Sequence, residues 1–289
     1  MDFRLTDDQR ALRRGVRELL ARRFDREALR AAVDAPTLDR ALWRELGDAG
    51  FFALRLPEEE GGVGLGLPEA VLLFEEAGRA LLPGPLVATH LAAGTVPGAA
   101  EGSAVVTSVD AGLVVWRDEA DVVLGDASGA VPMRSVDPLT PLHRVPGAGA
   151  AVAAGGPTAA LLHAAEQVGS AERTTEAAVA YAREREQFGQ VIGGFQAVKH
   201  LCAGMLVRAE LARAAVRAAS VTADPVEIAG AKLLADEAAV GNARDCLQVH
   251  GGMGFTWEAD VHLHLKRAWV RARLGMTAER AEEAVAASL

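Results

Sequence analysis

The feature that most constrains this chain is a series of long, alanine-rich helical patterns from about residue 157 to the end. The expected helices cover roughly 158–186, 195–220 and 224–248, followed by one from about Thr256 and a short one after Thr277. Asp224 as N-cap, Pro225 in the first turn and Glu227 three residues after the cap agree on one helix start. Because small alanine positions allow helices to pack closely, the segment predicts a four-helix bundle.

The first hundred residues are also helical in pattern, but the middle of the chain differs. Thr6 and Gln9 form a capping box, a second helix is expected from about Thr37, Pro68 is placed at the start of another, and one more is expected over 86–98. Short β-type runs follow at 104–107, 113–116 and 121–124 and predict a small meander. The predicted fold is mainly α with a small β insert, divided into an N-terminal helical domain (1–99), a reduced β-domain (100–150) and the C-terminal four-helix bundle (151–289).

Charge and composition exclude several classes of function. The formal net charge is −9 and aromatic residues make up 4% of the chain, so neither the basic surface nor the stacking surface of a nucleic-acid binder is expected. The uncharged stretch 145–165 contains two prolines and four glycines, which favours a loop leading into a helix over a membrane span. No signal peptide is recognisable. Cys202 and Cys246 have no ligand-type spacing and are expected to be buried free thiols, which favours a cytoplasmic location.

Two glycine-rich breaks interrupt the C-terminal helices. The first runs from Tyr181 to Gln196 and the second from Gln248 to Phe255. Each combines glycines with long polar side chains, so either break taken alone could be a solvated helix connection. Taken together they favour an anion site, because Arg185 can offer a planar fork to a phosphate and glycines allow backbone N–H groups to approach it.

The motifs themselves resemble those of a known family. Arg-Glu-Gln-Phe-Gly at 185–189 with Gln196 and His200, and Gln-Val-His-Gly-Gly-Met-Gly-Phe at 248–255, resemble the two C-terminal signatures of the acyl-CoA dehydrogenases. The segments 42–51 and 56–65 resemble the family's opening helical domain. The resemblance implies FAD as cofactor and the oxidation of acyl-CoA thioesters to 2-enoyl-CoA, in which a carboxylate removes the α-proton and the flavin accepts a hydride.

The resemblance also implies roles for particular residues. Arg185 matches the family's contact to the FAD pyrophosphate, and Gln248–Gly252 matches the stretch that closes over the adenosine–pyrophosphate end. In the family these residues commonly reach a flavin held by the adjacent subunit, so the cofactor site is expected at an interface. The expected cofactor-binding residues are Arg185, Gln187, Phe188, Phe195, Gln196, Gln248, Val249, His250, Gly251 and Gly252.

Two departures from the family pattern concern the reactive centre. The Thr-Glu-Pro and Ala-Gly-Ser-Asp signature that lines the flavin ring and thioester pocket is absent between 100 and 150. Gly275 stands where the family's catalytic glutamate is expected, and the alternative location falls on Ala159 and Ala160, which are apolar. Glu279 is the nearest carboxylate and is a weak candidate, because a carboxylate in a first helical turn more often serves the helix dipole.

Other candidate sites carry less weight. His262 and His264 alternate with apolar residues but would lie on different faces of a helix, so surface histidines are expected and no metal site is predicted. Ser170 and Ser220 lack a nucleophile-elbow context, which gives no hydrolase signal. The arginine-rich first helix is expected to be a solvated or intersubunit face.

The hypothesis from the sequence is one subunit of a heteromeric, FAD-dependent acyl-CoA dehydrogenase, active as a complex. It would contact the FAD diphosphate while a homologous full-length subunit supplies the base. The substrate would be a steroid side-chain thioester or another bulky acyl-CoA, and the family's electron acceptor is electron-transfer flavoprotein. Three alternatives stay open: a self-sufficient homo-oligomer with a relocated base, a flavin-free structural subunit, and a flavin-dependent monooxygenase.

Overall fold

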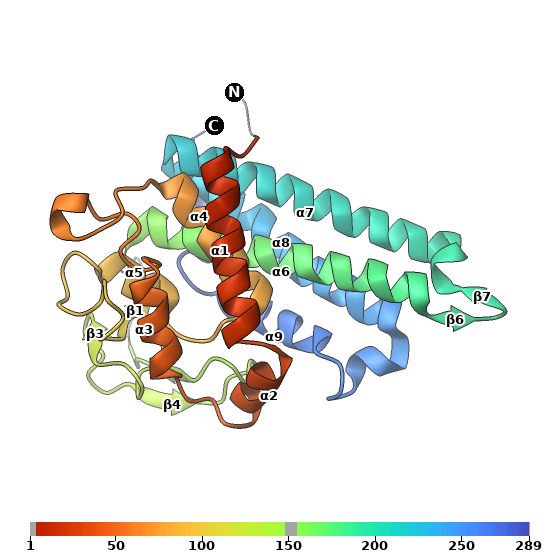
Figure 1. Cartoon of the computed structure of the whole chain (residues 1–289), viewed down its shortest axis with the longest axis horizontal. Coiled ribbons are helices and arrows are strands. Elements are labelled where there is room, and N and C mark those ends of the chain that lie inside the picture. The colour runs from red at the N-terminus through yellow and green to blue at the C-terminus, as the bar shows by residue number, and fades with distance from the viewer. Residues whose placement is uncertain (1–3, 148–154, 289) are drawn as a thin grey trace.

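The N-terminal part of the chain folds into five helices around an aromatic core. A computed structural model describes residues 4–147 and 155–288 (Figure 1). The helices are α1 (Asp7–Arg23), α2 (Arg26–Asp34), α3 (Arg40–Asp48), α4 (Leu67–Ala80) and α5 (Leu86–Ala92), with a 3-10 turn at Glu58–Glu60. Thr6 and Gln9 form the expected capping box of α1. Trp43, Phe51, Phe52 and Phe74 pack together in the core of this part.

A five-stranded sheet follows the helices. Its strands are β1 (Val106–Asp110), β2 (Leu113–Val115), β3 (Val122–Leu124), β4 (Val131–Met133) and β5 (Leu142–Arg144), in the spatial order β3-β1-β2-β5-β4. The β1–β3 pair is parallel and the other pairs are antiparallel, so the sheet is small, as predicted, but is not a simple meander. Ala111 and Gly112 both have positive φ and close the β1–β2 hairpin as a two-residue turn.

The C-terminal part is a bundle of three long helices and a shorter one. It comprises α6 (Gly156–Glu184), α7 (Gln196–Thr222), α8 (Pro225–His250) and α9 (Val261–Arg271), and α10 (Ala278–Ala286) follows. Buried alanines line the facing sides of α6 and α8, which allows close packing. A two-stranded hairpin, β6 (Glu186–Gln187) and β7 (Gln190–Val191), joins α6 to α7, and 3-10 turns lie at Ile192–Gly194 and Gly251–Phe255.

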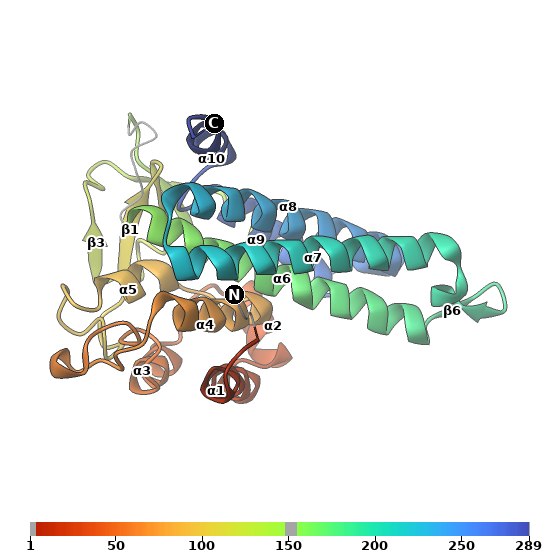
Figure 2. The same cartoon turned by 90° about the horizontal axis from the view of Figure 1, so that it is seen from above.

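Helix α4 ties the N-terminal helices to the bundle by crossing α6 at two glycines. A Cβ at Gly78 would lie 2.0 Å from the carbonyl oxygen of Glu166, and one at Gly169 would lie 1.8 Å from that of Glu75. Only glycine at both positions allows the two backbones to approach this closely. Figure 2 shows the result, with the N-terminal helices against one side of the bundle and the β6–β7 hairpin beyond its far end.

The structure also answers two smaller expectations. In the described ranges 4–147 and 155–288, no helix is long and apolar enough to cross a membrane. Cys246 is buried and Cys202 half-buried, and neither forms a disulfide. The uncharged stretch singled out in the sequence lies partly at 148–154, outside the described residues.

Candidate functional site: the glycine breaks and the missing base

The first glycine break is the projecting β6–β7 hairpin. Arg185 ends α6, and its carbonyl oxygen accepts a 2.8 Å hydrogen bond from the N–H of Ile192 that closes the base of the hairpin. Phe188 and Gly189 form the tip, both with positive φ, and the Phe188 ring is 92% exposed. The Phe188 and Phe195 rings are arranged edge to face, with their centroids 6.1 Å apart. The side chains of Arg185, Gln187 and Gln196 are exposed on this end of the molecule.

The second break lies beside the first. The rings of Tyr181 on α6 and His250 at the end of α8 are stacked, with centroids 4.2 Å apart. Gly251 has φ 58° and ψ −141°, a conformation that strongly favours glycine. A Cβ at Gly251 or Gly252 would have no protein atom within 4 Å, so both backbones are open to an approaching group.

The predicted cofactor residues are thus gathered at one end of the bundle, with one difference among them. Gln248, Gly251 and Gly252 are exposed and His250 is half-buried, whereas Val249 is buried in the apolar cluster between α6, α7 and α8. The Val249 side chain therefore packs in the core of the bundle and does not face an approaching ligand. Sequence spacing could not distinguish it, because a contiguous motif includes the inward-facing positions of the helix that carries it.

This end of the bundle has the electrostatic character of an anion site. Arg185, Lys199 and His200 are exposed and form no ion pair within the described part of the chain. The N-terminus of α7 has no side-chain cap, so its first N–H groups remain available to a ligand. Within the same described part, no group of His, Cys, Asp and Glu could hold a metal ion.

Gly275, which the sequence places where the family's catalytic glutamate is expected, leaves no room for a side chain unless its neighbours shift. Gly275 has φ +73°, and a Cβ there would lie 2.7 Å from Ala160 Cα and 3.1 Å from His163 Cδ2. Its N–H donates a 2.6 Å hydrogen bond to Asp110 Oδ2, which fixes the loop against the sheet. Ala160 belongs to the alternative base location, so the two family locations lie against each other and both lack a carboxylate.

A small polar cavity lies next to this position, where the three parts of the chain meet. It has a volume of about 50 Å³, and its lining includes Asp110, His163, Glu166 and Arg271. Arg271 donates to Glu166 at 2.6 Å, and His163 Nδ1 lies 3.0 Å from the other Glu166 oxygen. Burial raises the pKa of Glu166, but Arg271 and His163 outweigh it and keep the pKa below its ordinary value. A space of this size suits a few waters and not an acyl thioester.

The polar residues that line this cavity were not identified from the sequence. His163 and Glu166 are three residues apart on α6, a spacing that places them on one helix face, so this pair could have been found. Arg271 is distant in sequence, and only the packing of α9 against α6 brings it to Glu166.

Glu279, the nearest carboxylate candidate, lies on the surface of α10 and outside this cavity. It lies in the first turn of α10 with its side chain 71% exposed, 3.8 Å from Arg273. Hydrogen bonds to its own backbone N–H and to Thr277, with the charge of Arg273, lower the pKa of its carboxyl. Glu279 does not line the cavity beside Gly275.

The prediction of surface histidines at 262 and 264 was wrong. Both side chains are buried in α9, and burial together with nearby cations lowers the pKa of His262 to about 4 and that of His264 to about 3. His264 Nδ1 lies 2.8 Å from Ser170 Oγ. Apolar neighbours on both sides of each histidine were the overlooked signal, because they place this stretch of helix inside the protein.

An N-terminal helical part, a small sheet and a helical bundle with paired glycine breaks define the class of flavin-dependent acyl-CoA oxidising enzymes. Sequence profiles agree: residues 6–105 match the acyl-CoA dehydrogenase N-terminal domain and residues 151–289 match the C-terminal domain. The chain belongs to the acyl-CoA dehydrogenase family, whose members are FAD-dependent oxidoreductases acting on acyl-CoA.

Two relatives and two solved structures define the neighbourhood more closely. Acyl-CoA dehydrogenase IpdE2 of Mycobacterium tuberculosis is 39% identical over 295 residues, covering 93% of both chains. FadE34 of the same organism is 37% identical over 79% of this chain, which spans 39% of FadE34. The ChsE4-ChsE5 complex from Mycobacterium tuberculosis is similar in fold, with a TM-score of 0.86, 24% identity and coverage of 100% of this chain and 98% of that one. The Tcur3481-Tcur3483 steroid enzyme, in its G363A variant, has a TM-score of 0.85, 25% identity and 97% coverage of both chains.

Proposed function

We propose that this chain is one subunit of a heteromeric, FAD-dependent acyl-CoA dehydrogenase. It contacts the diphosphate end of FAD through Arg185, Gln196 and the Gln248–Gly252 loop at a subunit interface. A homologous full-length partner supplies the ring pocket, the thioester site and the general base. When bound at this interface, FAD would supply the hydride acceptor for the oxidation.

The observation that carries this proposal is the geometry of Gly275. Proton abstraction beside a thioester needs a positioned acceptor, and at residue 275 even a methyl group would collide with Ala160. The adjoining cavity has a volume of about 50 Å³, and its carboxylate Glu166 is paired with Arg271. Both observations support a base and an acyl pocket supplied by another polypeptide.

The residues of this chain fit the diphosphate end of FAD and not its ring end. Exposed Arg185, the open backbone at Gly251 and Gly252 and the uncapped start of α7 are groups that bind phosphates. They do not line the cavity beside Gly275. The role of this chain would be to hold and orient a phosphate group while the partner encloses the isoalloxazine.

An apolar face on α7 supports a partner subunit. Leu206, Val207 and Leu211 are exposed within two turns of this helix, and Val221 is exposed near its C-terminal end. Phe255 and Trp257 are 72% and 62% exposed beside the second glycine break. Exposed apolar side chains of this size and continuity are typical of protein interfaces.

The proposed substrate is a bulky acyl-CoA such as a steroid side-chain thioester. This part of the proposal rests on the relatives, since one similar structure is described as a steroid acyl-CoA dehydrogenase and another is a complex of two named subunits. Electron-transfer flavoprotein is the proposed acceptor.

The test is co-purification with a homologous full-length acyl-CoA dehydrogenase encoded beside this chain. The lone chain is expected to bind no FAD, and the complex is expected to carry FAD and to oxidise acyl-CoA. In the complex, Arg185→Ala should lower the FAD content measured by absorbance. Arg183→Ala is the matched control, because Arg183 is also exposed and lies two residues earlier, outside the 185–189 motif.

Three results would contradict the proposal. A lone chain that binds FAD and turns over at full rate would favour the homo-oligomer, and Glu279→Gln would then show whether that carboxylate is its base. An unchanged FAD content in the Arg185→Ala complex would favour a flavin-free structural subunit. A hydroxylated product formed with reduced flavin and oxygen would favour a monooxygenase.

A further inference from the structure

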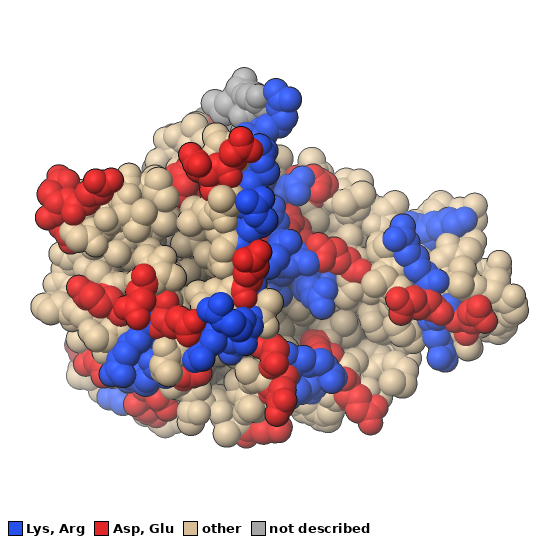
Figure 3. Space-filling model, viewed as in Figure 1, with Lys and Arg blue, Asp and Glu red and all other residues tan. Residues whose placement is uncertain are grey.

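A basic hollow lies between α1, α4 and α6, far from the glycine breaks. Its volume is about 240 Å³. Three arginines and one glutamate line its polar side, and small or apolar residues line the rest: Arg17, Arg79, Arg173, Glu76, Leu20, Ala21, Phe24 and Ala80. Figure 3 shows basic side chains running along α1 on this face of the molecule.

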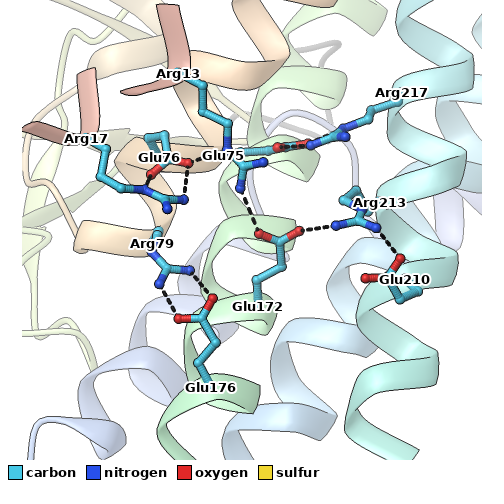
Figure 4. A network of polar contacts seen from close by, with 10 residues as sticks. All are labelled: Arg13, Arg17, Glu75, Glu76, Arg79, Glu172, Glu176, Glu210, Arg213 and Arg217. Atoms are coloured by element: carbon cyan, nitrogen blue, oxygen red, sulfur yellow. Dashed lines mark hydrogen bonds and ion pairs between the residues drawn. The ribbon is translucent and has the colours of Figure 1, made fainter. Parts of the chain in front are cut away.

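The arginines of the hollow are not fully paired. Arg17 donates Nε and Nη2 to Glu76 at 2.7 and 2.6 Å, which leaves its Nη1 without a partner within the described residues. Arg79 binds Glu176 through its two terminal nitrogens, so its Nε also has no partner within the described residues. Figure 4 shows these two guanidiniums near each other, with their carboxylates on opposite outer sides.

Arg173 adds a third cation to the hollow, and its charge also acts on Glu176. It is exposed on α6, and no hydrogen bond or ion pair within the described residues holds its guanidinium. The lining therefore holds three guanidiniums and one carboxylate, with Glu176 bonded to Arg79, and each guanidinium has at least one donor unused. Like charges brought together in this way favour a bound anion, and guanidinium forks match the oxygens of a phosphate.

We infer that the hollow between α1, α4 and α6 is a binding site for a phosphate ester. The phosphate oxygens would accept hydrogen bonds from Arg17, Arg79 and Arg173. The apolar wall formed by Leu20, Phe24 and Ala80 would take the carbon chain of the ester, which distinguishes this ligand from inorganic phosphate. The site is separate from the proposed FAD contacts, because none of its lining residues belongs to either glycine break.

Isothermal titration calorimetry of the full chain at low ionic strength tests this inference, with n-hexyl phosphate as the probe and inorganic phosphate for comparison. Hexyl phosphate is expected to bind at one site per chain, more tightly than inorganic phosphate, and to bind more weakly at higher salt. Arg173→Gln should weaken binding by about tenfold, the equivalent of one charged hydrogen bond. Arg14→Gln is the matched control, because Arg14 is also exposed and unpaired within the described residues but does not line the hollow.

Two results would overturn the inference: no saturable binding of hexyl phosphate, or equal affinity in the Arg173→Gln and unsubstituted chains. If inorganic phosphate binds as tightly as hexyl phosphate, the apolar residues do not contribute to binding, and the ligand would not need to be an ester. Sedimentation with phosphatidic acid vesicles identifies the source of the ester. Arg173-dependent sedimentation would assign the site to a lipid headgroup, and calorimetric binding without sedimentation would assign it to a soluble ester. Neither readout depends on FAD or on a partner subunit.

Discussion

At the scale of single residues, Gly275 differs from most other glycines of the chain because both its backbone and its surroundings exclude a side chain. Its φ of +73° is strained for any other residue, and the space a Cβ needs is taken by the backbone of Ala160. Gly230, inside α8, has neither constraint, since a Cβ there meets no atom within 4 Å. The two positions make a matched pair.

Gly275→Ala is expected to destabilise the fold by about 3 kcal/mol, as left-handed strain adds to overpacking against α6. Gly230→Ala should instead stabilise it, by up to about 1 kcal/mol, through helix propensity. Urea denaturation of both variants measures the difference. A Gly275→Ala chain as stable as the unsubstituted one would show that the loop can move, and a restored glutamate at 275 would then be worth testing as a base.

His264 predicts an acid-sensitive stability. Burial and the surrounding arginines lower its pKa to about 3, whereas the unfolded chain keeps the ordinary value of 6.5. The unfolded state therefore binds more protons between these values, so this stabilisation is present above pH 6.5 and is lost as the pH falls. The loss between pH 7 and 5 should be about 2 kcal/mol, and a neutral His264→Asn variant should lack most of it. Urea denaturation at both pH values checks this, and an equal loss in the variant would assign the acid sensitivity elsewhere.

Single residues also show which parts of the candidate site could be predicted from the sequence. Counting forward from the second signature predicted that Gly275 stands at the expected position of the glutamate, because the distance from a motif to a site residue can be read from the sequence. The buried pairing of Arg271 with Glu166 could not be located in this way, since the two residues are 105 positions apart and only the fold joins them. The wrong prediction for His262 and His264 had a different cause, since their apolar neighbours were already present in the sequence.

At the scale of elements, ion pairs connect α1, α4, α6 and α7 where these helices meet (Figure 4). Arg13 reaches both Glu76 on α4 and Glu172 on α6, and Arg217 on α7 makes two hydrogen bonds to Glu75 on α4. The first helix was expected to be a solvated or intersubunit face. Its inner arginines instead bind carboxylates of this chain, and its outer ones are exposed.

Neutralising two carboxylates of this network, Glu76 and Glu172, should change the stability of the fold by different amounts. Burial raises the pKa of Glu76, but hydrogen bonds from Arg17 and Arg13 outweigh it, so the pKa is lowered and the charged form is stabilised. Burial and the charge of Glu75 raise the pKa of Glu172, so its charged form is disfavoured. Glu76→Gln should cost about 2 kcal/mol at pH 7 and less as the pH falls below 4.5. Glu172→Gln should change the stability by less than about 1 kcal/mol. Denaturant titrations of both variants measure the contrast, and a larger loss in Glu172→Gln would reverse the assignment.

The elements that the sequence missed are those held by local geometry. Helix α2 has nine residues and is capped by Asp25, too short for a clear apolar period. The β6–β7 hairpin was interpreted as a glycine-rich break, because its strands have two residues each and its turn includes Phe188 at a positive φ. Long helices with strong caps, such as α8 after Asp224, were predicted to within two residues.

At the scale of the whole molecule, the features group into two regions. The small cavity and Gly275 lie where the three parts of the chain meet, whereas the exposed motif residues lie at the far end of the bundle. This separation is expected of any subunit whose bundle end contacts a flavin held by its neighbour, whether that neighbour is a second copy or a homologous chain. The glycine at 275 favours the homologous chain, and α7, which begins at the hairpin, offers an apolar surface for that contact.

The last prediction concerns this face of α7. If a homologous partner covers Leu206, Val207 and Leu211, a charge placed among them must be desolvated without a counter-ion, which costs several kcal/mol. Leu211→Glu is therefore expected to abolish co-purification of the partner, and the FAD with it, while leaving the circular dichroism of the lone chain unchanged. Val136→Glu is the control, since Val136 is also about half exposed but lies in the segment between β4 and β5 and not on α7. Size-exclusion chromatography with light scattering measures the assembly. An intact complex in Leu211→Glu would place the partner elsewhere, whereas its loss in both variants would indicate general misfolding.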